Sequence, residues 1–87
     1  MPKIESAGSN LISNELVITI RNDGKSYLNG SFIEPDSLAK VFSSASQVSD
    51  SVKILIVADE ETELKHVTKV VDLCRLNGIS DFRLQSR

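Results

Sequence analysis

The sequence predicts an α+β fold of two layers, in which a mixed sheet carries two helices on one face. Three observations predict it. Apolar and polar residues alternate along 16–21 and again along 81–85, as in strands with one buried face. Residues 35–45 and 61–77 have apolar residues at helical spacing. The run 54–58 between them is apolar on both faces, which is typical of a central strand, so the element order is ββαβαβ.

The first two strands are predicted to form a hairpin. Leu16, Ile18 and Ile20 fall on one face of the first strand, followed by the turn signal Asp23-Gly24. A short second strand is expected around 26–29, with another turn at Asn29-Gly30.

The first helix is predicted to begin at Pro35, because proline has the φ angle of a first helical residue. Asp36 is interpreted as its cap. One apolar stripe then follows the helical period, at Leu38, Val41, Phe42 and Ala45.

The second helix is predicted to place Leu64, Val67, Val71 and Cys74 on its buried stripe and to stop at Gly78. A closing strand follows, with Phe82 and Leu84 inward and Asp81, Arg83 and Gln85 outward. A strand, a helix and another strand predict a parallel pair with a right-handed crossover.

Enzyme chemistry is not predicted. An acidic cluster follows the central strand, where α/β sheets place ligands, and it could serve as a Mg²⁺ site or a phosphoacceptor. No second acidic cluster completes such a site, so these acids are interpreted as charges in a first helical turn that complement the helix dipole. The cluster consists of Asp59, Glu60, Glu61 and Glu63.

No cofactor or metal is expected either. His66 has no neighbouring cysteine or paired histidine and is interpreted as a surface residue, and Cys74 as a small core residue rather than a nucleophile. The net charge is −2 with both signs interleaved, which argues against nucleic acid as a partner.

Several motifs, in this order, resemble the periplasmic domain of the ExbD/TolR family. They are a strand followed by Asp23-Gly24, the Leu28-Asn29-Gly30 turn, Ala58-Asp59 after an apolar strand, and Asn77-Gly78-Ile79 before the last strand. The resemblance covers nearly all of the chain from Leu16 onward. The two glycine turns resemble the ExbD hairpin more than that of TolR.

The resemblance implies a domain organisation. Family members carry one N-terminal transmembrane helix, a Leu-Pro-Lys-like segment and a flexible tether, and Pro2-Lys3 matches that segment. We therefore expect residues 1–15 to be a flexible linker following a transmembrane helix that this sequence lacks, and 16–87 to be the periplasmic domain. The family's proton-carrying aspartate belongs to that helix, so no residue here is assigned its role.

The resemblance implies a subunit of a proton-driven TonB–ExbB–ExbD motor. The subunit is anchored in the inner membrane by its single helix. The motor energises outer-membrane uptake of nutrients such as iron-siderophore complexes. ExbB-like and TonB-like proteins are the expected partners, with peptidoglycan and a second copy as further ones. Two alternatives stay open: a TolR-like subunit of envelope maintenance, and a free-standing cytosolic regulatory domain of STAS-like or receiver-like build.

The predicted partner-binding site is an exposed strand edge. If the closing strand lies beside the central strand, its residues Phe82, Arg83, Leu84 and Gln85 leave backbone groups unpaired for another strand. In the predicted tether, Leu11 and Ile12 are the adjacent large apolar residues that could pair there. Pro2 and Lys3 complete the set of residues expected to bind partners.

Overall fold

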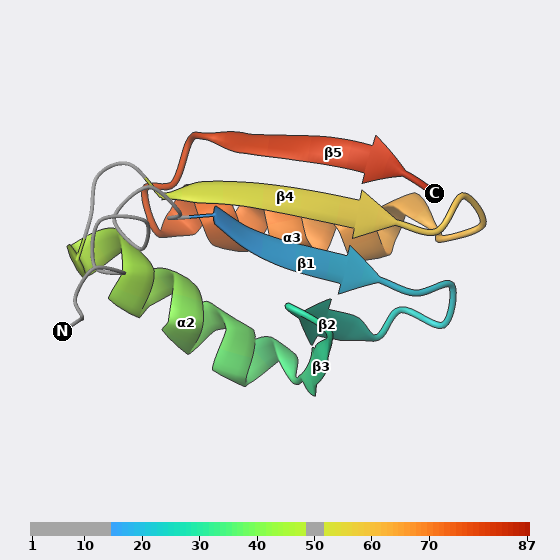
Figure 1. The fold of residues 1–87 in the computed structure, drawn as a ribbon, viewed down its shortest axis with the longest axis horizontal. Coiled ribbons are helices and arrows are strands. Elements are labelled where there is room, and N and C mark those ends of the chain that lie inside the picture. Colours follow the sequence, from blue (N-terminus) through green and yellow to red (C-terminus); the bar gives the residue numbers. More distant parts are fainter. Residues whose placement is uncertain (1–14, 49–51) are drawn as a thin grey trace, which may run out of the picture.

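The fold is a five-stranded sheet with two helices, seen in a computed structural model that describes residues 15–48 and 52–87 (Figure 1). The strand order across the sheet is β3-β2-β1-β4-β5. The strands are β1 (Glu15–Ile20), β2 (Ser26–Leu28), β3 (Ser31–Ile33), β4 (Lys53–Ala58) and β5 (Phe82–Ser86). The helices are α2 (Pro35–Val48) and α3 (Leu64–Leu76).

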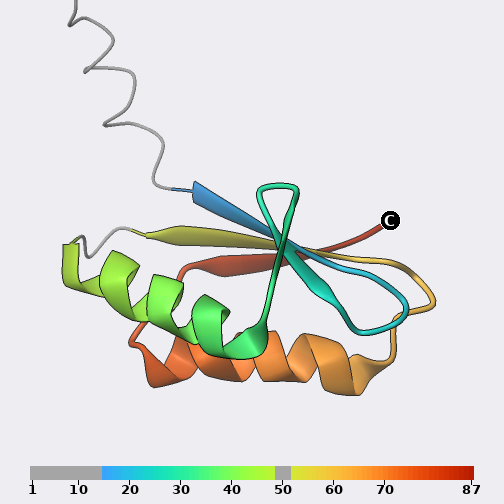
Figure 2. The same cartoon turned by 90° about the horizontal axis from the view of Figure 1, so that it is seen from below.

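Both helices cover the same face of the sheet, and the opposite face carries no helix of the described residues (Figure 2). The sheet is mixed, because β1 pairs with β4 and β4 with β5 in parallel, whereas β1–β2 and β2–β3 are antiparallel. The predicted two-layer α+β architecture is therefore confirmed.

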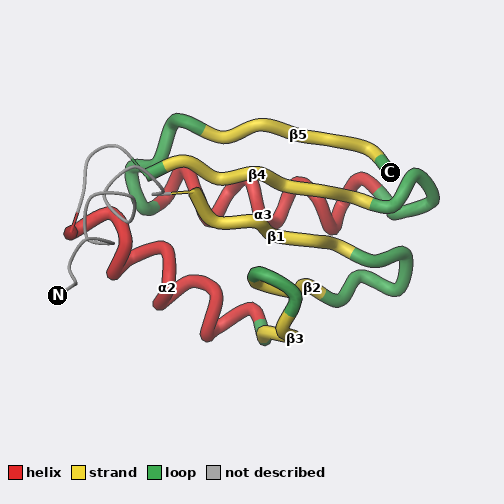
Figure 3. The backbone as a smooth tube through the Cα atoms, in the orientation of Figure 1, coloured by secondary structure: helices red, strands yellow, loops and turns green. Residues whose placement is uncertain are grey.

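One short element was not predicted. The turn at Asn29 and Gly30 leads into the third strand β3, which pairs with β2 through Tyr27–Phe32 and two flanking pairs (Figure 3). Asn29 has a positive φ of 49°, and its side-chain Oδ1 accepts a hydrogen bond from the Val17 N–H at 3.0 Å. This bond holds the turn against β1. The chain then continues as β3, which pairs with β2.

The start of α2 also differs in one detail from the prediction. Pro35 is the first helical residue, and the carbonyl of Glu34 accepts the Leu38 N–H at 2.9 Å. Asp36 therefore lies within the first turn and is not the cap. A carboxylate in that turn still interacts favourably with the helix dipole.

The core lies between the sheet and the helices. Its fully buried members come from β1, β4 and both helices, so every long element contributes to it. The largest of them are Phe42, Ile18, Ile20, Leu38, Ile54, Ile56 and Cys74.

Two predicted core residues are exposed. The buried positions of α3 are Val70 and Cys74, and Leu64 lies ten residues before Cys74, about 80° further round the helix. Its side chain is 75% exposed. Leu84 is 59% exposed because β5 is an edge strand with a described neighbour on one side only. The helix and the strand were predicted correctly. Leu64 does not lie on the buried stripe of α3, whereas Leu84 faces the helix layer as predicted, in register with Ile56, but is not buried.

The predicted stop of α3 at Gly78 is confirmed. Gly78 has a φ of +74°, and its N–H donates to the Arg75 carbonyl at 3.1 Å. The next N–H, of Ile79, donates back to Cys74 at 2.9 Å, which pulls Ile79 into the core. This left-handed turn directs the chain from the helix layer into β5.

Candidate partner-binding site

The candidate surface for strand addition is the outer edge of β5. β5 is the last strand of the sheet and pairs on one side with β4, from Ile54↔Phe82 to Ala58↔Ser86. Among the described residues no strand covers its other side (Figure 1). Residues 82–85 therefore lie at an edge of the sheet, as expected.

The backbone of this edge alternates. The Asp81 carbonyl accepts a hydrogen bond from the Ile54 N–H at 3.0 Å. The Arg87 N–H donates to the Ala58 carbonyl at 2.9 Å, and the Arg87 carbonyl accepts from the Glu60 N–H at 3.0 Å. In a parallel ladder the groups that face one neighbour come from every second residue. The odd-numbered residues therefore bond to β4, and the N–H and C=O groups of Phe82, Leu84 and Ser86 point outward.

The side chains alternate as well. Phe82 and Leu84 lie in register with Ile54 and Ile56, on the helix-covered face, whereas Arg83 and Gln85 lie on the open face. Arg83 Nη2 donates to Glu15 Oε2 at 3.0 Å across the sheet. Since this pair is solvent-exposed, it contributes little to stability. The exposed Leu84 is the apolar side chain against which side chains of an added strand would pack.

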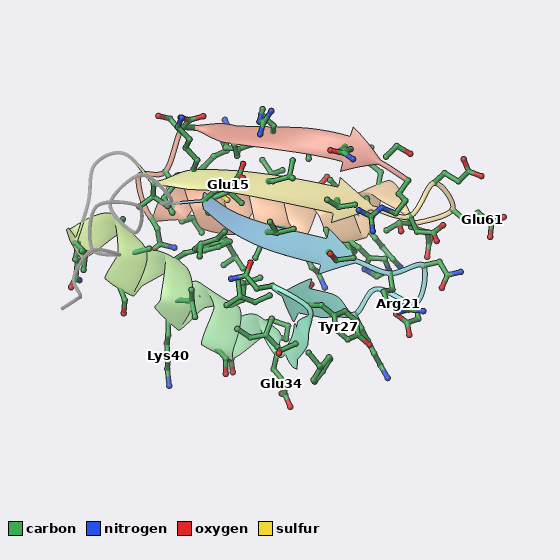
Figure 4. All side chains as sticks on the ribbon, viewed as in Figure 1. Glu15, Arg21, Tyr27, Glu34, Lys40 and Glu61 are labelled. Carbon is green, nitrogen blue, oxygen red and sulfur yellow. The ribbon has the colours of Figure 1, made fainter. Side chains whose placement is uncertain are left out.

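The opposite edge offers much less. β3 has three residues, and it is followed directly by Glu34 and by Pro35, which has no N–H to donate. Its Phe32 packs edge-on against Tyr27 on the open face, with ring centroids 5.7 Å apart. The Arg21 guanidinium lies 5.8 Å from the Tyr27 ring centroid (Figure 4). Short edges of this kind discourage strand addition, so β5 is the better docking edge.

Four residues of the predicted set lie outside the described residues. These are Pro2, Lys3, Leu11 and Ile12. The pairing of Leu11 and Ile12 with β5 stays a prediction, and so does the role of Pro2 and Lys3 in binding partners. The division of the chain into a linker 1–15 and a domain 16–87 likewise stays a prediction.

The acidic cluster after β4 forms a loop rather than a first helical turn, which corrects the prediction. α3 begins at Leu64 with Glu63 at its N-cap, and Glu61 projects from the preceding loop (Figure 4). Asp59 organises that loop, because its Oδ1 accepts the Glu61 N–H at 2.9 Å and its carbonyl accepts the Thr62 N–H at 2.8 Å. Within 15–48 and 52–87, no three histidine, cysteine or acidic side chains are grouped as metal ligands.

His66 was predicted to be a surface residue, and the structure places it at the surface but half-buried. Its side chain is 20% exposed. A Cβ built on Gly24 would lie 2.6 to 2.9 Å from three atoms of the His66 ring, so the ring packs directly on the hairpin turn. Glu63 Oε1 lies 4.0 Å from His66 Nε2. Sequence reasoning missed this contact because the two residues are far apart in the chain.

Cys74 is the core residue that was expected, and its burial has a measurable consequence. Burial raises the pKa of its thiol from 9.0 to about 11, because the thiolate loses its hydration. An unfolded chain releases this proton near pH 9 while the folded chain keeps it. We expect the free energy of unfolding to fall as the pH rises from about 9 to about 11, and this group to have no such effect below pH 9.

Chemical denaturation across this pH range tests the expectation, with Cys74→Ala as the control. The variant should lack this part of the pH dependence. Parallel curves for the two proteins would show that the thiol titrates alike in the folded and unfolded chains.

The family model described as "Biopolymer transport protein ExbD/TolR" matches residues 1–87, the whole sequence. The chain belongs to the ExbD/TolR family. No curated protein matches the chain. The resemblance inferred from the turn motifs is thereby confirmed at the family level.

Members of the ExbD/TolR family are accessory subunits of energy-transducing transport systems. They work with ExbB/TolQ-type and TonB/TolA-type proteins, and they are single-pass inner-membrane proteins with a periplasmic domain. Among the described residues of this chain, neither helix has the length and apolar character needed to cross a membrane.

Proposed function

We propose that this chain is the periplasmic domain of an ExbD-like subunit of a TonB–ExbB–ExbD motor. The motor uses the proton gradient of the inner membrane to energise nutrient uptake at the outer membrane. The domain acts in it as a binding module without catalytic activity. The observation that carries this proposal is the exposed edge of β5 in a member of the ExbD/TolR family.

Binding occurs by strand addition at that edge. The outward N–H and C=O groups of Phe82, Leu84 and Ser86 hydrogen-bond to an extended segment, and the Leu84 side chain packs against the neighbouring side chains of that segment. Main-chain hydrogen bonds tolerate different sequences. The same edge therefore accepts a TonB segment, residues 10–13 of the tether, or the β5 edge of a second copy.

Because one bound segment can replace another at β5, the edge can alternate between a free and an occupied state. Proton flow changes how two copies sit in the ExbB ring, and one state leaves the edge free while the other has it occupied. A ligand shifts such an equilibrium only by its difference in affinity for the two states. In this proposal the difference comes from the competition for β5.

Leu84→Pro tests strand addition directly. Proline removes the N–H of residue 84, which faces away from β4, so the ladder to β4 stays intact. We expect the variant to fold and to bind a TonB-derived peptide about tenfold more weakly, because an outward hydrogen bond is lost and the ring obstructs the edge. Amide shift titration of the 87-residue chain with the peptide measures the affinity, and hydrogen exchange measures the protection of the β5 amides.

Leu84→Ala is the matched control, since it shortens the side chain and keeps the N–H. It should weaken binding less than the proline variant does. Equal binding by all three proteins, or peptide-induced shifts that avoid residues 82–86, would show that this edge is not the site.

The ExbD role is tested separately in cells. The full-length protein with Leu84→Pro should lose siderophore-dependent growth in iron-poor medium while the cell envelope stays intact. Loss of envelope integrity with normal iron uptake would instead assign the TolR-like role.

A further inference from the structure

A second surface feature lies away from β5, beside the turn that joins β1 to β2. A cavity of about 200 Å³ opens between the hairpin turn after β1, the start of α2 and residues 66–73 of α3. The proposed strand-addition site has no part in it, because β5 and the β1–β2 turn are separated by β4 and β1.

The floor of this cavity is apolar. Leu38 of α2 and Val70 of α3, both buried members of the core, line it together with Pro35 and Leu73. Leu38 and Val70 are buried, so Pro35 and Leu73 supply the apolar surface that solvent reaches in the cavity. Such a surface favours a ligand group that is itself apolar.

The rim of the cavity is cationic. Lys25 and Lys69 line it, and no carboxylate of the described residues forms an ion pair with either. The acid beside them, Asp23, already accepts the Lys25 backbone N–H at 3.0 Å through its Oδ1. A bound carboxylate would supply both ammonium groups with a counter-charge.

The side of the cavity formed by the hairpin turn and α3 is fixed before a ligand binds. His66 also lines the cavity, and its ring is held against Gly24 by close packing. The N–H of Gly24 in turn donates to the Arg21 carbonyl at 2.8 Å, which fixes the turn. A preformed wall lowers the ordering cost of binding.

We propose that this cavity binds a partner protein through an apolar side chain flanked by a carboxylate, carried on an acidic peptide segment. Its volume is below the roughly 300–1,000 Å³ of sites that enclose whole small molecules, and it suits a single anchoring side chain. The apolar floor receives the anchor, while Lys25 and Lys69 bind the neighbouring carboxylate. This inference does not depend on the proposed function.

NMR titration of the 87-residue chain with the capped tripeptide Glu-Leu-Glu tests the proposal. The amide signals of Gly24, Lys25, Lys69 and Leu73 should shift, and those of β5 should not. The capped tripeptides Lys-Leu-Lys and Glu-Ser-Glu remove the charge and the anchor in turn. Each should bind at least about fivefold more weakly.

Lys69→Gln should lower the affinity for Glu-Leu-Glu about threefold or more, since it removes one rim charge. Lys40→Gln is its control, because Lys40 is exposed on α2 and points away from the sheet (Figure 4). Equal affinity for the acidic and basic tripeptides, an unchanged affinity of the Lys69 variant, or shifts confined to other surfaces would each overturn the proposal.

Discussion

Gly24→Ala should lower the free energy of unfolding by about 2 to 4 kcal/mol, a large effect for a change of one methyl group. Two causes act together. Gly24 has a φ of +89°, which strains any residue with a Cβ, and the new Cβ would lie 2.6 Å from the His66 ring. Urea denaturation measures the change, and the folded state should respond by moving the ring away from the hairpin turn.

Gly30→Ala is the matched control. Gly30 has nearly the same φ, +92°, but no atom lies within 4 Å of a Cβ built there. Its cost should therefore be that of backbone strain alone, about 1 to 2 kcal/mol. Identical losses at the two glycines would mean that the His66 ring yields freely.

A double-mutant cycle separates the contact from the strain. In a His66→Ala background, Gly24→Ala should cost about 1 kcal/mol less than in the native protein, because the clash has been removed. Additive effects of the two substitutions would contradict the packing of His66 against the turn.

Phe42→Ala should destabilise the domain by about 3 to 5 kcal/mol and unfold a substantial fraction of it at physiological temperature. Phe42 is the largest fully buried side chain, and it joins α2 to the sheet. A domain of this size has one small core, so the cavity left behind removes a large share of its total stability. Thermal denaturation followed by circular dichroism measures the loss.

Phe32→Ala makes the same chemical change on the opposite face. Phe32 is 53% exposed and contacts Tyr27 edge-on, so we expect a loss of only about 0.5 to 1.5 kcal/mol. A loss comparable to that at Phe42 would show that the open face of the sheet contributes a second core.

Local patterns were enough to predict most elements of this fold. The alternation in β1, the apolar run of β4 and the stripe through Leu38 and Phe42 each reflect burial that is set within one strand or helix. The stop at Gly78 was predictable for the same reason, since a left-handed residue is a local requirement.

The candidate site was predictable only in part. An edge position for residues 82–85 followed from the order of the strands. The exposure of Leu84 did not, because alternation along a strand says which side chains share a face and not whether a helix covers them. The cavity beside His66 had no sequence signal, since its lining comes from three separate segments.

By itself, the sequence determined the two-layer α+β class and the type of every described element except β3, because periodicity and turn chemistry act over a few neighbouring residues. The order of its turn motifs resembled the ExbD/TolR family, to which the family match assigns the chain. Only the tertiary structure decided that β1 lies parallel to β4, that Leu64 faces away from the core and that His66 rests on Gly24. Such contacts join residues far apart in the chain. They depend on how whole elements pack together, and a local sequence pattern does not predict that packing.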